Sequence, residues 1–79
     1  MAKVDAREIA PRIVVDPDVH FGKAVIKGTR VPIEVILEQL ALGGSVADVA
    51  DEYGVSIDDV LAVLKYAHDV IASEEVRAV

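Results

Sequence analysis

The sequence predicts a single, mainly α-helical domain in which a short N-terminal β-hairpin precedes a bundle of three helices. Three observations lead to this fold class. Two short runs of β-branched residues lie within residues 12–28. Three segments with the apolar period of an amphipathic helix follow within residues 32–72. Glycines and serines separate these segments, as is typical of helix ends. With 79 residues, the chain is long enough for one domain.

The hairpin is predicted from two strands, residues 12–16 and residues 24–27, with a loop at residues 18–22 between them. Residues 1–11 are expected to form an arm, either frayed or coiled into one short helical turn. An isolated hairpin is only marginally stable in water. We therefore expect the hairpin to pack on the helices or to pair with another chain.

The first helix is predicted to begin at Pro32, because proline suits the first turn and Glu34 favours a helix N-terminus. Gly28 allows the chain to turn from the second strand towards this helix. Gly43 and Gly44 are expected to end it. Its apolar stripe comprises Ile33, Ile36, Leu37, Leu40 and Ala41.

Ser45 and Ser56 begin the second and third helices, because each precedes an aspartate by three residues, as in a capping box. Gly54 ends the second helix, and residues 73–79 form a charged tail that is expected to fray. The main apolar stripe of the third helix is expected to face the core and comprises Ile57, Val60, Leu61, Leu64, Ala67 and Ile71. A second stripe exceeds what one small core requires and predicts a dimer interface formed by Val63, Tyr66 and Val70.

Residues 46–64 fit the spacing of a helix-turn-helix, with Ala50 where two helices cross and Gly54 at the turn. This spacing predicts a tri-helical architecture. In DNA-binding proteins of this type, the start of the second helix contacts bases and phosphates. Here that region carries Asp58 and Asp59, whose charge is repelled by phosphate. A structural use of the motif is therefore favoured over DNA recognition by this helix.

The net charge of −6 disfavours nonspecific attraction to nucleic acid or to an anionic membrane. The charge is uneven, since residues 1–30 carry six basic and four acidic groups and residues 31–79 carry two basic and ten acidic groups. Three cations, Lys23, Lys27 and Arg30, gather around the second strand and are predicted to bind a partner. The sequence shows neither a run of ~18 apolar residues that would span a bilayer nor a signal peptide, so a cytoplasmic location is expected.

Few residues suggest catalysis or metal binding. The Lys-Gly-Thr order at residues 27–29 puts the lysine in the wrong place for a phosphate-binding loop, so this glycine is interpreted as a turn residue. His20 and His68 lie far apart in a chain without cysteine. Asp58 and Asp59 point about 100° apart on a helix, which favours helix capping over an acid–base pair. We therefore expect no enzyme activity, no metal and no cofactor.

Residues 22–32 read GKAVIKGTRVP, and a Gly-Gly-Ser step and Tyr53 follow. This pattern resembles the hallmark of a small prokaryotic family, domain-of-unknown-function family 433, over about residues 13–67. The Gly-Thr-Arg-x-Pro core is its most specific part. Ala24 stands where the family usually has proline, and residues 54–56 replace its usual Tyr-Pro step. The residues expected to have structural roles in the motif are Gly22, Gly28, Thr29, Pro32, Gly43 and Gly54.

The resemblance implies a homeodomain-like or winged-helix-like helical bundle with a β-hairpin. It also implies an antitoxin role, because many members lie beside genes for PIN-like ribonucleases. We therefore expect an antitoxin-like protein that dimerises and masks such a nuclease. Lys23, Lys27 or Arg30 would enter its acidic, Mg²⁺-binding site through charge-assisted hydrogen bonds. Two alternatives stay open. The basic hairpin could bind operator DNA in a transcriptional regulator, or the chain could be an oligomerisation module with no client.

Overall fold

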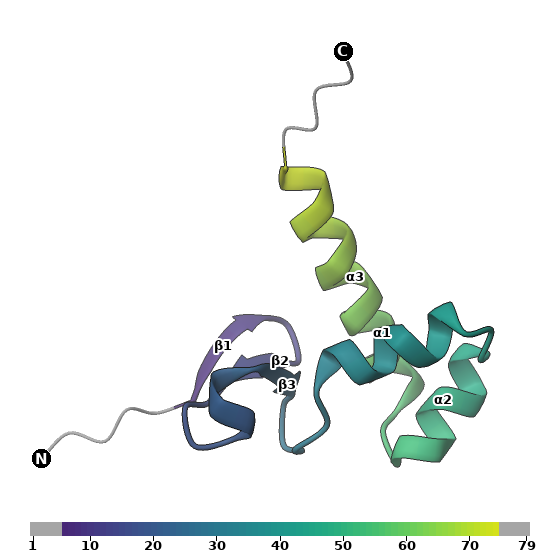
Figure 1. Cartoon of the computed structure of the whole chain (residues 1–79), viewed down its shortest axis with the longest axis horizontal. Helices are drawn as coiled ribbons and strands as arrows, with labels where there is room; N and C mark the ends of the chain where they lie inside the picture. Colours follow the sequence, from purple (N-terminus) through teal and green to yellow (C-terminus); the bar gives the residue numbers. More distant parts are fainter. Residues whose placement is uncertain (1–5, 75–79) are drawn as a thin grey trace, which may run out of the picture.

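The structure is a computed structural model that describes residues 6–74. A three-stranded antiparallel sheet precedes three helices; the first and third helices contact the sheet, and the C-terminal part of the third extends away from the body (Figure 1). The elements are β1 (Arg7–Ala10), β2 (Ile13–Val15), the 3₁₀ turn η1 (His20–Gly22), β3 (Ala24–Ile26), α1 (Ile33–Ala41), α2 (Val46–Tyr53) and α3 (Ile57–Ser73).

The predicted hairpin is confirmed by β2 and β3, which pair antiparallel with Ile13 opposite Ile26 and Val14 opposite Val25. Successive residues of a strand face opposite sides of the sheet. The Ile13–Ile26 pair therefore faces the helices, where both side chains are buried in the core. The Val14–Val25 pair faces the other side of the sheet.

The sheet contains a third strand that the sequence did not predict. Part of the predicted arm, residues 6–11, holds β1, which pairs with β2 as an edge strand; the remainder of the arm lies outside the described residues. No residue of β1 is buried. Its position therefore does not require alternating apolar and polar residues, which is the pattern by which a half-buried strand is predicted. Arg12, predicted to open the first strand of the hairpin, instead turns the chain with a φ of 69°.

The three predicted helices are confirmed, and so are their ends. The Ser45 hydroxyl accepts a hydrogen bond from the Asp48 N–H at 3.1 Å. Ser56 and Asp59 form a reciprocal capping box, with both hydrogen bonds at 3.0 Å. Gly54 ends α2 in the left-handed conformation, with a φ of 67°. The short connection between α2 and α3 therefore follows directly from local sequence.

One core joins the sheet to all three helices. Its buried side chains are Ile13, Ile26, Ile33, Ile36, Val49, Ala50, Val60 and Val63. The aliphatic composition explains why no aromatic residue is fully buried, and Tyr53 and Tyr66 pack only against the edge of this core.

The faces of α3 differ from the prediction. Val60, from the predicted core stripe, and Val63, from the predicted dimer stripe, are both fully buried. The other large residues of the predicted core stripe, Ile57, Leu61, Leu64 and Ile71, are exposed. Both stripes have helical spacing, so periodicity alone could not decide which one the sheet and the other helices would cover.

The predicted tail begins close to the observed end of α3 at Ser73, and residues 75–79 of it lie outside the described residues. None of the helices within residues 6–74 combines the length and the apolar character needed to cross a bilayer.

Candidate partner-binding site

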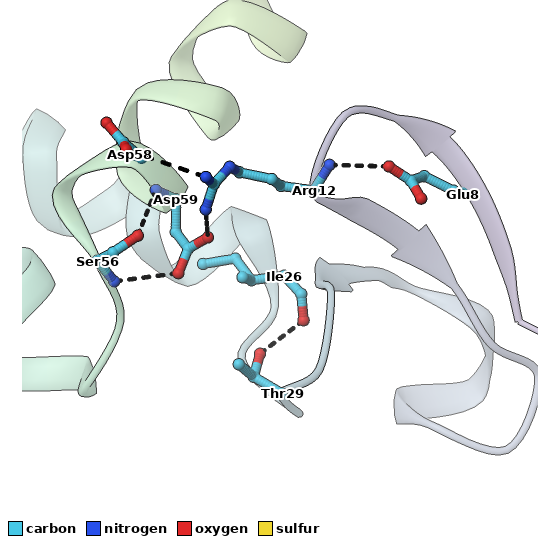
Figure 2. Close-up of polar contacts among 7 residues, drawn as sticks. All are labelled: Glu8, Arg12, Ile26, Thr29, Ser56, Asp58 and Asp59. Atoms are coloured by element: carbon cyan, nitrogen blue, oxygen red, sulfur yellow. Dashed lines mark hydrogen bonds and ion pairs between the residues drawn. The ribbon is translucent and has the colours of Figure 1, made fainter.

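The chain leaves β3 through a tight turn that holds the Gly-Thr-Arg-x-Pro motif. Gly28 has a φ of 79°, which residues with a side chain rarely adopt. The Thr29 hydroxyl donates to the Ile26 carbonyl at 2.7 Å and accepts from the Val31 N–H at 3.0 Å (Figure 2 draws the first of these bonds). The Ile26 N–H donates to the Val31 carbonyl at 3.0 Å. The turn is therefore fixed by its own hydrogen bonds.

The remaining motif residues also have structural roles. Pro32 precedes the first turn of α1 and forms an isolated antiparallel bridge with Val25. Gly22 lies near the end of the loop between β2 and β3, and Gly43 follows α1; both have positive φ. The predicted structural residues therefore lie where the chain changes direction, and the motif fixes the path from β3 to α1.

Arg30 lies in the middle of this fixed turn, and its side chain is exposed. It forms no ion pair with any of residues 6–74. Because the residues on either side are hydrogen-bonded into the turn, the backbone of Arg30 is held in place while its guanidinium faces solvent. The structure therefore presents this cation on a rigid base.

The two lysines predicted to act with Arg30 are already paired. Lys23 donates to Glu34, in the first turn of α1, at 2.6 Å, and Lys27 donates to Glu8, on β1, at 3.0 Å. The hydrogen bond from Lys27 is the main cause that lowers the pKa of Glu8 below its ordinary value. The two lysines thus reach different elements, and neither is an unpaired charge like Arg30.

Arg12 has a role that the sequence did not reveal. Its Nη1 lies 2.9 Å from Asp59 Oδ1 and its Nη2 lies 3.9 Å from Asp58, so its guanidinium contacts the N-terminus of α3 (Figure 2). Its backbone N–H donates to Glu8 at 3.1 Å, and its carbonyl accepts from the Lys27 N–H at 2.8 Å. Arg12 therefore links the β1–β2 turn to both the sheet and α3.

The Arg12–Asp59 contact predicts a pH-dependent contribution to stability. Partial burial opposes ionisation of Asp59, but hydrogen bonds from Ser56 and Arg12 outweigh it and lower the pKa of Asp59 below 3.8. The pKa of Asp59 is lower in the folded protein than in the unfolded chain. The ionised carboxylate therefore stabilises the fold fully above its ordinary pKa, and this stabilisation is lost as pH falls through the folded-state pKa.

We expect Asp59→Asn to cost about 1 kcal/mol of unfolding free energy at neutral pH. Asparagine cannot ionise, so the difference between the variant and the wild type should shrink as pH falls below 3.8. Urea denaturation of both proteins across this range measures it. Asp16→Asn is the matched control, because within residues 6–74 this carboxylate accepts the Asp18 N–H and forms no ion pair. A difference for Asp59→Asn that is independent of pH would contradict this account.

The loop between β2 and β3 displays the single phenylalanine of the chain to solvent. His20, Phe21 and Gly22 all have positive φ, and Phe21 is fully exposed. For a bulky residue, this backbone conformation is uncommon. This exposure could not be predicted from the sequence, because a phenylalanine in an aliphatic chain is normally expected in the core.

The predicted dimer residues do not form one free surface. Val63 is fully buried in the core of the chain itself, so its assignment to an interface is wrong. Tyr66 packs against the core, and only Val70 is exposed. The prediction failed because this stripe is the one that the sheet and the other helices cover.

The histidines and acidic residues do not assemble a recognisable metal site within residues 6–74, where no three potential ligands gather. His20 and His68 are both exposed, and His68 Nδ1 lies 3.0 Å from Asp69 on the same helix. The helix-free face of the sheet has an open hollow of about 360 Å³ over Val14 and Val25. The Lys27–Glu8 ion pair contributes to its lining.

The fold and the site together define a small protein in which a three-stranded sheet and three helices hold a rigid, cation-bearing turn. The model of one family, described as a protein of unknown function (DUF433), matches residues 13–67. The chain therefore belongs to the DUF433 family, and the predicted resemblance is confirmed.

Among solved structures, the X-ray crystal structure of Rv2018 from Mycobacterium tuberculosis is similar to this chain. It shares 35% sequence identity and has a TM-score of 0.62 over 66% of this chain. The similar region covers 24% of that longer chain. A search of curated proteins finds no match.

Proposed function

We propose that this protein is an antitoxin-like binding protein that masks a PIN-like ribonuclease. The observation that carries the proposal is Arg30, a solvent-facing guanidinium on a turn that is fixed by Gly28 and Thr29. A nuclease that holds Mg²⁺ with a carboxylate cluster offers such a cation several acceptor oxygens. Guanidinium groups bind carboxylates with paired, charge-assisted hydrogen bonds. Inserted there, Arg30 would compete with Mg²⁺ for these oxygens and block the site.

The charge of the remaining surface supports the same kind of partner. Of the six cationic side chains described, Arg12, Lys23, Lys27 and Lys65 contact carboxylates, whereas Arg7 and Arg30 have no such contact within residues 6–74. The helices are strongly acidic, and a nuclease that binds RNA has a basic groove. Acidic helices beside an inserted arginine would therefore cover both parts of a nuclease site.

DNA recognition, the alternative function, has weaker support. The short α2–α3 connection is similar to a helix-turn-helix, and a homeodomain-like bundle would place α3 against DNA. The first turn of α3 carries Asp58 and Asp59, which already contact Arg12. The hairpin lysines contact carboxylates as well. Few cations are therefore free to neutralise phosphates, which supply most of the affinity for DNA.

The experiment uses the full chain and the product of the neighbouring gene, which this proposal requires to be a PIN-like nuclease. RNA cleavage by the purified nuclease should stop when this protein is added in equal amount. The same protein preparation is titrated with its own upstream DNA at increasing salt. Undiminished cleavage in the presence of the protein would overturn the proposal, and specific, salt-sensitive DNA binding would favour the regulator instead. Failure of both assays would leave the oligomerisation module.

A further inference from the structure

One side of α3, next to the side that packs in the core, carries an exposed apolar seam. The seam consists of Ile57, Leu61, Leu64 and Ile71, whose exposed fractions lie between 37% and 65%. The C-terminal half of α3 extends beyond the rest of the molecule, so this part of the seam is reachable from solvent (Figure 1). None of its four members belongs to the buried core.

The seam has the spacing of a coiled coil. With His68 included, successive positions are separated by four, three, four and three residues along α3. An apolar repeat of 3.5 residues keeps one stripe facing a partner helix along its whole length. Binding to a flat or irregular protein surface would not require this repeat. Packing against a second helix with the same repeat would. The second copy of the chain supplies such a helix.

The charges beside the seam select an orientation for the two helices. Asp58 and Lys65 lie seven residues apart and therefore on the same flank of the seam. In an antiparallel pair, this flank meets the same flank of the other helix, which brings Asp58 of one copy to Lys65 of the other, twice by symmetry. A parallel pair would place uncharged residues there. Lys65 also contacts Asp69 on its own helix at 2.8 Å.

We infer that the protein forms an antiparallel homodimer through the α3 seam, with Leu61 of each copy packed against Leu64 of the other. A symmetric interface of this kind uses the same patch on both copies. It lies on a different element from Arg30, so this inference does not rest on nuclease binding. It also replaces the predicted dimer surface, which shares no residue with the seam.

The first test is the molar mass of the full chain by sedimentation equilibrium up to about 0.5 mM. We expect a dimer for the wild type. Leu61→Lys should raise the dimer dissociation constant at least about a hundredfold, because it removes two buried leucines and brings in two charges. The matched control is Val70→Lys, an exposed position about 120° from the seam around the same helix. It should leave the dimer unchanged.

The second test needs no change to the apolar residues. Asp58→Lys and Lys65→Asp each place like charges together twice, so each alone should weaken the dimer about three- to tenfold. An equal mixture of the two variants should recover wild-type affinity, because the mixed dimer restores both opposite-charge contacts. Recovery supports the antiparallel seam even if Leu61→Lys fails to fold.

Three results would overturn the inference. They are a wild type that stays monomeric over the whole range, dissociation by Val70→Lys but not by Leu61→Lys, and no recovery in the mixture of charge variants. The wild type would also stay monomeric if the seam bound the helix of a different protein, and this outcome too would overturn the inference.

Discussion

Replacing Ile26 by alanine is expected to lower the free energy of unfolding by about 2–5 kcal/mol. Ile26 is fully buried, pairs with Ile13 across the sheet and belongs to the core that joins the sheet to the helices. Truncation loses the transfer free energy of the removed carbons. It also leaves a cavity between the sheet and the helices, which can relax only partly to fill it. In a chain of this size such a loss is a large part of the total stability.

The effect can be assigned to the side chain because the backbone contacts of this residue persist in the variant. The Ile26 carbonyl still accepts from Thr29, and its N–H still donates to Val31. Urea denaturation monitored by circular dichroism measures the change, with Leu42→Ala as the control. Leu42 is exposed at the end of α1, so this variant should lie within about 0.5 kcal/mol of the wild type. Equal losses in the two variants would contradict the assignment of the core.

Local signals in the sequence were sufficient for most elements. Ser45, Ser56 and Gly54 mark helix ends with chemistry that operates within a few residues, and the structure has caps at each of them. The β-branched runs around Ile13 and Val25 correctly indicated β2 and β3. These elements were predictable because their stabilising contacts are near in sequence or follow from simple alternation.

The errors all involve contacts between distant residues. β1 is held by pairing with β2 and has no buried residue of its own to identify it. The two apolar stripes of α3 are equivalent in sequence, and only tertiary packing distinguishes Val63 from Leu61. Which of two good helical faces is covered is therefore a property of the assembled fold.

The candidate site was predictable in part for the same reason. The Gly-Thr-Arg-x-Pro segment indicated a strand-to-helix junction, and the structure places Arg30 on it without a carboxylate partner within residues 6–74. The sequence could not show that the two neighbouring lysines form ion pairs, Lys23 with Glu34 and Lys27 with Glu8. The contact between Arg12 and Asp59 joins residues 47 positions apart, and many other cations could have served the start of α3 equally well.

Removing the side chain of Arg30 is expected to have the largest effect on partner binding. Under the proposed function, the guanidinium is buried against the nuclease carboxylates, and Arg30→Ala leaves those carboxylates without their partner. Loss of one member of a buried, hydrogen-bonded charge pair costs about 2–5 kcal/mol, which is about 30-fold to several thousandfold in the dissociation constant. Arg30→Lys should recover only part of the loss, because an ammonium cannot make the paired contacts of a guanidinium.

The decisive measurement is the dissociation constant of the complex between this protein and the nuclease partner that the proposed function requires, determined by calorimetry for the wild type, Arg30→Ala and Arg7→Ala. Arg7 lies on the edge strand β1 and carries the same charge, so Arg7→Ala controls for net charge alone. We predict a loss of at least about 30-fold for Arg30→Ala and less than about fivefold for Arg7→Ala. Equal affinities of Arg30→Ala and the wild type would contradict the role of Arg30 as the group that enters the nuclease site.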